Sequence, residues 1–148
     1  MPVNPIPEGY HTVTPALNVK HADTLIDFLK RAFGAEERSR MQAPGGPVMH
    51  AEVRIGDSFL MLSEAMTESP TASALMLYVK DCDAVWKQAQ DAGAKSLMAP
   101  EDMFWGDRFA RVSDPFGNRW GIATHKEDVA PDEMERRAKE WMAKNPKP

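Results

Sequence analysis

The chain has 148 residues, of which 43% are hydrophobic and 27% are charged, and this composition is typical of one globular domain with a buried core. Its formal net charge is −4 and no lysine or arginine block precedes the C-terminal tail, which argues against nucleic acid as a partner. A single cysteine, a proline-rich N-terminus and the lack of a long apolar run exclude a disulfide, a secretory signal and a membrane span, so we expect a cytoplasmic protein.

The chain contains an internal repeat. Residues 17–23 (LNVKHAD) are echoed by residues 77–83 (LYVKDCD), and a helical pattern follows each copy and ends at Gly34 or Gly93. Each copy predicts a strand, a Lys-x-x-Asp turn and a helix. We expect the aspartates of these turns, Asp23 and Asp83, to be the N-caps of the two helices.

Three strands are predicted after each helix. They span 37–41, 48–55 and 58–63 in the first half, and 95–99, 108–113 and 119–124 in the second. The chain is therefore predicted to be an α+β fold of two βαβββ modules, about 11–65 and 72–125, within a domain of residues 1–126. Neither half covers both of its faces alone, so we expect curved mixed sheets around a shared cavity.

Residues 127–148 differ in composition from the rest of the chain and predict an amphipathic helical tail. Pro131 fits the start of this helix. Its apolar stripe consists of Met134, Ala138, Trp141 and Met142. The stripe favours docking on the chain's own sheet or on a sister subunit over a separate partner.

The strand at 48–55 carries the first group of candidate site residues. Alternation assigns its apolar residues to one face and leaves His50, Glu52 and Arg54 on the other, which should be the concave face. His50 is the best general acid or base, with Glu52 as its catalytic neighbour and Arg54 as a ligand contact. The alternative is a buried network in which the three side chains satisfy one another.

The second half supplies further candidates for ligand binding. In the last strand, Gly121 and His125 share one face, where Gly121 leaves room for a ligand or, alternatively, marks a bulge. In the loop 103–108, Trp105 and Arg108 can form a lid over a planar or anionic ligand. The alternative is that the loop aromatics plug the core.

The repeat, the closing motif DPFGNRW (114–120) and the phrases TPALNVK, HAEVRIGDSFLML and FWGDR together resemble the vicinal-oxygen-chelate (VOC) superfamily, of the glyoxalase/bleomycin resistance protein/dioxygenase type. The resemblance covers nearly the whole chain and is closest to the PhnB-like (3-demethylubiquinone methyltransferase-like) subgroup. It implies the glyoxalase/bleomycin resistance fold and, together with the apolar stripe of the tail, a homodimer. The alternative is a monomer in which the duplicated chain closes its own cavity. The sequence contains no strand that is followed by a glycine-rich turn of the kind that binds a nucleotide-like cofactor, so the residues do not support methyl transfer.

The same resemblance implies four positions for the ligands of a divalent metal ion. They fall on Thr14, Glu52, Ala74 and Gly121, of which only Glu52 can coordinate in the usual way. We therefore expect no cofactor. A divalent metal remains an alternative if Glu52 is joined by His50 or His125 in a displaced site.

These residues and the resemblance predict a small-molecule binding or enzymatic protein of the glyoxalase/bleomycin resistance type, without the usual metal site. The alternative is a divalent-metal-dependent lyase, isomerase or dioxygenase with the displaced ligand set. Antibiotic sequestration is a third possibility. The substrate, and whether any catalysis occurs, stay open at this stage.

Overall fold

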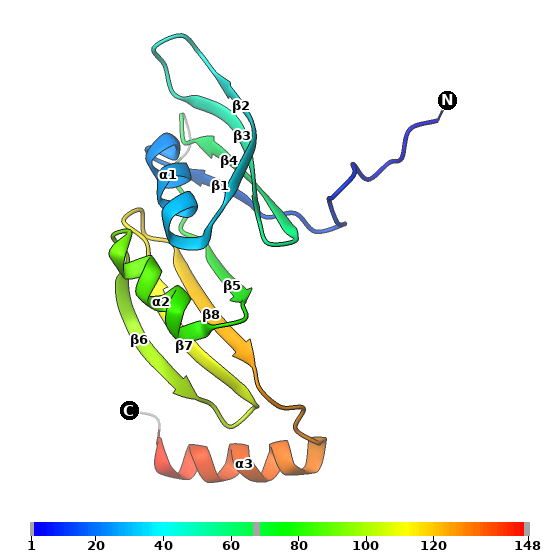
Figure 1. Cartoon of the computed structure of the whole chain (residues 1–148), viewed down its shortest axis with the longest axis vertical. Helices are drawn as coiled ribbons and strands as arrows, with labels where there is room; N and C mark the ends of the chain where they lie inside the picture. The colour runs from blue at the N-terminus through cyan, green and yellow to red at the C-terminus, as the bar shows by residue number, and fades with distance from the viewer. Residues whose placement is uncertain (1, 67–68, 147–148) are drawn as a thin grey trace.

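The computed structural model describes residues 2–66 and 69–146 and consists of two βαβββ modules followed by a helix (Figure 1). Module one contains β1 (Ala16–Val19), α1 (Ala22–Phe33), β2 (Glu36–Gln42), β3 (Val48–Ile55) and β4 (Ser58–Glu64). Module two contains β5 (Ala74–Tyr78), α2 (Cys82–Asp91), β6 (Lys95–Asp102), β7 (Asp107–Ser113) and β8 (Arg119–His125). The predicted α+β architecture is confirmed.

The two sheets have the same topology. Their strand orders are β1-β4-β3-β2 and β5-β8-β7-β6, and the first strand of each module pairs in parallel with the fourth, while the other pairs are antiparallel. The duplicated sequence therefore gives a duplicated fold.

Each helix packs against one face of the sheet of its own module, and the two helices also pack against each other. In α1, Leu25, Ile26 and Leu29 are completely buried, as their helical spacing predicts. The side chain of Arg31 donates a hydrogen bond to the carbonyl of Ala92 at 3.2 Å, at the end of α2. This contact joins the two modules on their helical side.

The predicted N-caps are wrong for both helices, because each helix begins two residues earlier than expected. Asp81 caps α2, with its carboxylate accepting a hydrogen bond from the amide of Ala84 at 3.1 Å. For α1, the carboxylate of Glu64 at the end of β4 accepts from the amides of His21 and Ala22 at 2.8 and 3.1 Å. A side chain distant in sequence thus caps α1, which local reading cannot show.

A buried aspartate fixes the turn between β7 and β8. One oxygen of Asp114 accepts from the amides of Phe116 and Asn118 at 2.8 and 3.0 Å. The other oxygen accepts from the side chains of Asn118 and Trp120, each at 2.9 Å. The DPFGNRW motif therefore holds the hairpin that leads into β8.

The C-terminal helix α3 (Pro131–Lys144) lies across the far end of module two (Figure 1). None of its residues is buried, and Trp141 is 41% exposed. Its attachments are to the loop between β6 and β7, through Arg137 to the carbonyl of Phe104 at 3.3 Å and through Trp141 to the Phe104 ring. The expected helix is present and contacts a loop, with Met134 and Ala138 half-buried and Trp141 and Met142 exposed.

Across residues 2–66 and 69–146, no helix combines the length and the apolar character needed to cross a membrane.

Candidate functional site

A pocket of about 980 Å³ lies between the two modules. Module one contributes residues from the N-terminal segment, the end of α1 and the β3–β4 hairpin, while module two contributes β5, the residues after it and the end of β8. Most of the lining side chains are apolar or aromatic. They include Val13, Phe33, Ile55, Phe59, Leu75, Leu77, Tyr10, Tyr78 and Val79, with His11, Thr14, Asp57, Ser58, Lys80, Thr124 and His125 as the polar members.

An aromatic pair forms part of the module-one wall. The rings of Tyr10 and Phe59 stack with their centroids 4.7 Å apart and an interplanar angle of 18°. The guanidinium of Arg38 lies 4.9 Å from the centroid of Phe59, at cation–π distance. The N-terminal segment is thereby packed on the β3–β4 hairpin and presents flat rings to the pocket.

Tyr10 also approaches Glu52 of β3. Burial raises the pKa of Tyr10 to about 12, and the neighbouring Glu52 carboxylate adds to this rise. The Tyr10 hydroxyl comes close to Glu52 without forming a regular hydrogen bond, while Ser39 donates one to Glu52 at 3.0 Å. The approach of Tyr10, followed by the Ser39 hydrogen bond, lowers the pKa of Glu52. Glu52 is therefore held as a carboxylate.

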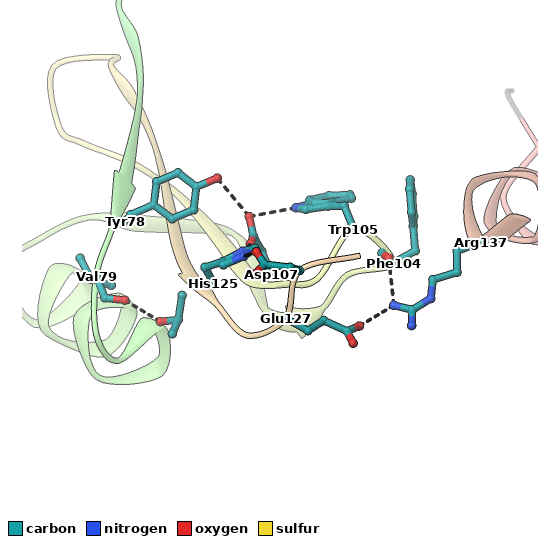
Figure 2. A network of polar contacts seen from close by, with 10 residues as sticks. Tyr78, Val79, Phe104, Trp105, Asp107, His125, Glu127 and Arg137 are labelled. Carbon is teal, nitrogen blue, oxygen red and sulfur yellow. Dashed lines mark hydrogen bonds and ion pairs between the residues drawn. The ribbon is translucent and has the colours of Figure 1, made fainter. Parts of the chain in front are cut away.

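At the module-two end, several side chains converge on Asp107 at the start of β7 (Figure 2). Its carboxylate is 4% exposed. One oxygen accepts from the Tyr78 hydroxyl at 3.2 Å and from the indole of Trp105 at 3.1 Å, and the other oxygen lies 2.8 Å from Nδ1 of His125. Three neutral or cationic donors thus surround one buried negative charge.

The imidazole of His125 bridges two carboxylates. Its Nε2 lies 2.8 Å from Asp128, and this contact together with the Asp107 contact raises the pKa of His125. The raised pKa favours the imidazolium form, because both ring nitrogens then donate to acids. His125 lines the pocket, as we expected of a ligand-binding residue.

His50, Glu52 and Arg54 share one face of β3, as strand alternation predicts. Ala51 and Val53 are completely buried on the helical side, and the three polar residues occupy the opposite face. However, none of the three lines the pocket between the modules. Arg54 pairs with Glu36 at 2.8 Å beside a separate, shallower depression. His50, Glu52 and Arg54 therefore lie outside this pocket, on the part of the sheet that β2 and β3 form.

The loop 103–108 is held in place by other parts of module two. Trp105 packs against Phe104 and Phe109 and donates to Asp107, and it is not among the residues that line the pocket. Arg108 forms ion pairs with Asp83 at 2.6 Å and Asp102 at 3.2 Å. The predicted lid residues thus support the pocket end from behind, and Arg108 is directed to α2.

The space beside Gly121 is filled by the protein itself. A Cβ atom at this position would lie 2.6 Å from Sδ of Met76 and 3.1 Å from the Phe109 ring. Gly121 therefore allows close packing of Met76, which in turn lines the pocket.

The positions implied for a divalent metal do not offer a matching donor set. Thr14 lines the pocket, Glu52 is engaged by Ser39 and Tyr10, and Gly121 has no side chain. Among the described residues, no three His, Cys, Asp or Glu side chains come close enough together to hold a metal ion. The residues present do not fit the usual site.

Sequence reasoning missed Tyr10, Tyr78, Asp107 and Asp128. Tyr78 could have been found from alternation in β5, where it shares a face with Met76. Asp107 is next to Arg108 in a phrase already noted, but its burial depends on the pairing of β7 with β8. Tyr10 and Asp128 lie in segments without helices or strands that flank the two modules. The sequence carries no signal that these segments pack onto the site.

Comparison with known proteins supports the fold. Residues 10–122 match the Glyoxalase/Bleomycin resistance protein/Dioxygenase superfamily. An uncharacterized protein of Mycobacterium bovis is 35% identical over 135 residues, which cover 83% of this chain and 89% of that protein.

Two solved structures share the fold at lower identity. One is TnmS3, an antibiotic-binding protein from Streptomyces sp. CB03234, with 24% identity, a TM-score of 0.63 and coverage of 78% of this chain and 96% of that one. The other is the PhnB protein from Bacillus cereus, with 18% identity, a TM-score of 0.59 and coverage of 77% and 99%.

Proposed function

The chain belongs to the Glyoxalase/Bleomycin resistance protein/Dioxygenase superfamily, and from this premise we propose that it captures an aromatic small molecule in the pocket between its modules, without a metal ion at the usual VOC position. The observation that carries the proposal is the pocket itself. Its volume of about 980 Å³ is at the upper end of the range for small-molecule sites, and its lining is mainly apolar and aromatic.

The flat rings at both ends of the pocket favour a planar ligand. The stacked Tyr10 and Phe59 rings lie on the module-one side, and the ring of Tyr78, a residue that is 65% exposed, lies on the module-two side. Planar ligands gain stacking contacts with such rings in addition to the burial of apolar area. TnmS3, a protein of the same fold, is an antibiotic-binding protein, which supports a small molecule as the ligand.

The donor set supports binding without a metal. At the four implied positions only Glu52 carries a carboxylate, and that carboxylate is engaged by Ser39 and Tyr10. A divalent ion held by one such group would keep most of its water and bind weakly.

We further propose that the protein works in the cytoplasm and forms a homodimer. The reduced, buried Cys82 suits the first proposal, and the exposed Trp141 and Met142 of α3 suit the second. Size-exclusion chromatography with light scattering measures the oligomeric state, and a monomer at micromolar concentration would contradict the dimer.

A neutral fluorescent dye, N-phenyl-1-naphthylamine, tests the binding function. We expect saturable binding of one dye per chain. Ser58 is exposed on the pocket wall, so Ser58→Trp should occupy part of the pocket without disturbing the core and weaken binding at least about tenfold, which corresponds to about 1.4 kcal/mol.

Thr24→Trp is the matched control, because Thr24 is exposed on α1 and does not line the pocket. It should bind the dye as the wild type does. Equal affinities for the wild type and Ser58→Trp, or the lack of any saturable binding, would refute capture in this pocket.

A further inference from the structure

Nε2 of His125 contacts the carboxylate of Asp128, which makes no other side-chain hydrogen bond among the described residues. Asp128 lies 2.8 Å from Nε2, and its side chain is fully exposed to solvent. An exposed ion pair of this kind contributes little to stability and exchanges readily. Another acidic oxygen could therefore replace Asp128 at low cost.

His125 keeps its orientation without Asp128, because its other nitrogen is fixed. Nδ1 lies 2.8 Å from the buried carboxylate of Asp107, which is the β7 residue paired with His125 across the sheet. A buried acid on one imidazole nitrogen fixes the ring and leaves the second N–H available to an acceptor.

Among the partners of Asp107, the hydrogen-bond inventory identifies His125 as the one with a donor left for a ligand. Tyr78 and Trp105 each have a single polar hydrogen, and both hydrogens are directed to Asp107. His125 alone among the three partners of Asp107 has a second N–H. Its side chain is 52% exposed and lines the pocket.

We propose that Nε2 of His125 recognises an acidic oxygen of the ligand, such as a carboxylate, phenolate or sulfonate, and that Asp128 occupies this place until the ligand arrives. This inference rests on the proposed function and specifies its ligand class as aromatic acids. Lys80 lines the same pocket and adds a positive charge, Asp57 in the β3–β4 turn adds a carboxylate, and the charge of His125 itself faces Asp107 and Asp128.

Two dyes with the same aromatic frame provide the test. N-phenyl-1-naphthylamine is neutral, and 8-anilinonaphthalene-1-sulfonate adds one sulfonate, which stays ionised throughout the accessible pH range. Asp128→Asn removes the competing carboxylate and should raise the affinity for the sulfonate by about two- to fivefold, the range set by an exposed ion pair. The affinity for the neutral dye should not change.

Asp132→Asn is the matched control, since it removes the same charge from an exposed position in the first turn of α3. It should change neither affinity. His125→Gln should weaken binding of the sulfonate selectively, by about fivefold or more. The wild-type affinity for the sulfonate should fall as the pH rises through the pKa of His125, whose ring nitrogens contact Asp107 and Asp128 and which shares Asp107 with Tyr78 and Trp105.

The outcomes separate the two proposals. If the neutral dye binds but Asp128→Asn behaves like Asp132→Asn toward the sulfonate, the recognition of acids is overturned and the aromatic pocket stands. If neither dye binds in a saturable way, the proposed function fails and the inference fails with it.

Discussion

The carboxylate of Asp107 lies 2.8 Å from the imidazole of His125 and is almost completely withdrawn from solvent, with 4% of its side chain exposed. The two residues are opposite each other at the ends of β7 and β8, where the sheet of module two meets the pocket. One acid therefore organises the polar end of an otherwise apolar cavity.

Asp107→Asn should destabilise the protein by about 2 kcal/mol, since an amide nitrogen replaces an acceptor that faces Tyr78, Trp105 or His125. Urea unfolding followed by circular dichroism measures the change. Asp102→Asn is the control, because Asp102 is an exposed acid that accepts only from Arg108. Equal unfolding midpoints for the two variants would contradict the role given to Asp107.

His125 should make stability depend on pH. Its pKa is raised above the ordinary value of 6.5 by Asp128 and Asp107, so the folded state binds the proton more tightly than the unfolded state. The resulting stabilisation is fully present below about pH 6.5 and is lost as the pH rises through the folded pKa. The difference in unfolding free energy between the wild type and His125→Gln should therefore shrink from pH 6 to pH 9.

A difference that stays constant over this range, or grows with pH, would show that the imidazole is neutral when bound to its two acids.

Asp114→Asn should cost about 3 kcal/mol, because an amide nitrogen then replaces one of the two buried carboxylate oxygens, each of which accepts two hydrogen bonds. The matched control is Asp57→Asn, in the corresponding turn of module one, where the carboxylate is exposed and accepts only from Ser58. Thermal and urea unfolding of the two variants should differ clearly. A similar, small effect of both would mean that the turn tolerates loss of the charge.

Local sequence patterns are sufficient to predict both of these turns. The DPFGN motif and the Gly56-Asp57 pair both predict hairpin turns, and both turns are present. Strand alternation likewise separates Ala51 and Val53 from Glu52. Such local patterns are enough for the duplicated fold.

Longer-range contacts explain what the sequence could not provide. The cap of α1 comes from Glu64, and the wall of the pocket comes from Tyr10 of one module and Tyr78 of the other. The first contact depends on how β4 packs beside α1 within module one. The second depends on how the two modules pack, which places the pocket beside β5 and the β3–β4 hairpin rather than over His50.

Metal titration tests the donor set. Cobalt added to protein purified without chelators should show no saturable visible absorption at one equivalent, because Glu52 is the only usual ligand type among the implied positions. Glu52→Gln should give the same trace as the wild type. A stoichiometric endpoint that Glu52→Gln abolishes would instead support the metal-dependent lyase, isomerase or dioxygenase.

Amide chemical-shift mapping with N-phenyl-1-naphthylamine locates a ligand directly. Our account predicts that the largest changes occur at residues 75–80, at Thr124 and His125, and at residues 55–60, which line the pocket between the modules. Changes confined to the outer surface of α1 or to β2, or no changes at saturating dye, would contradict it.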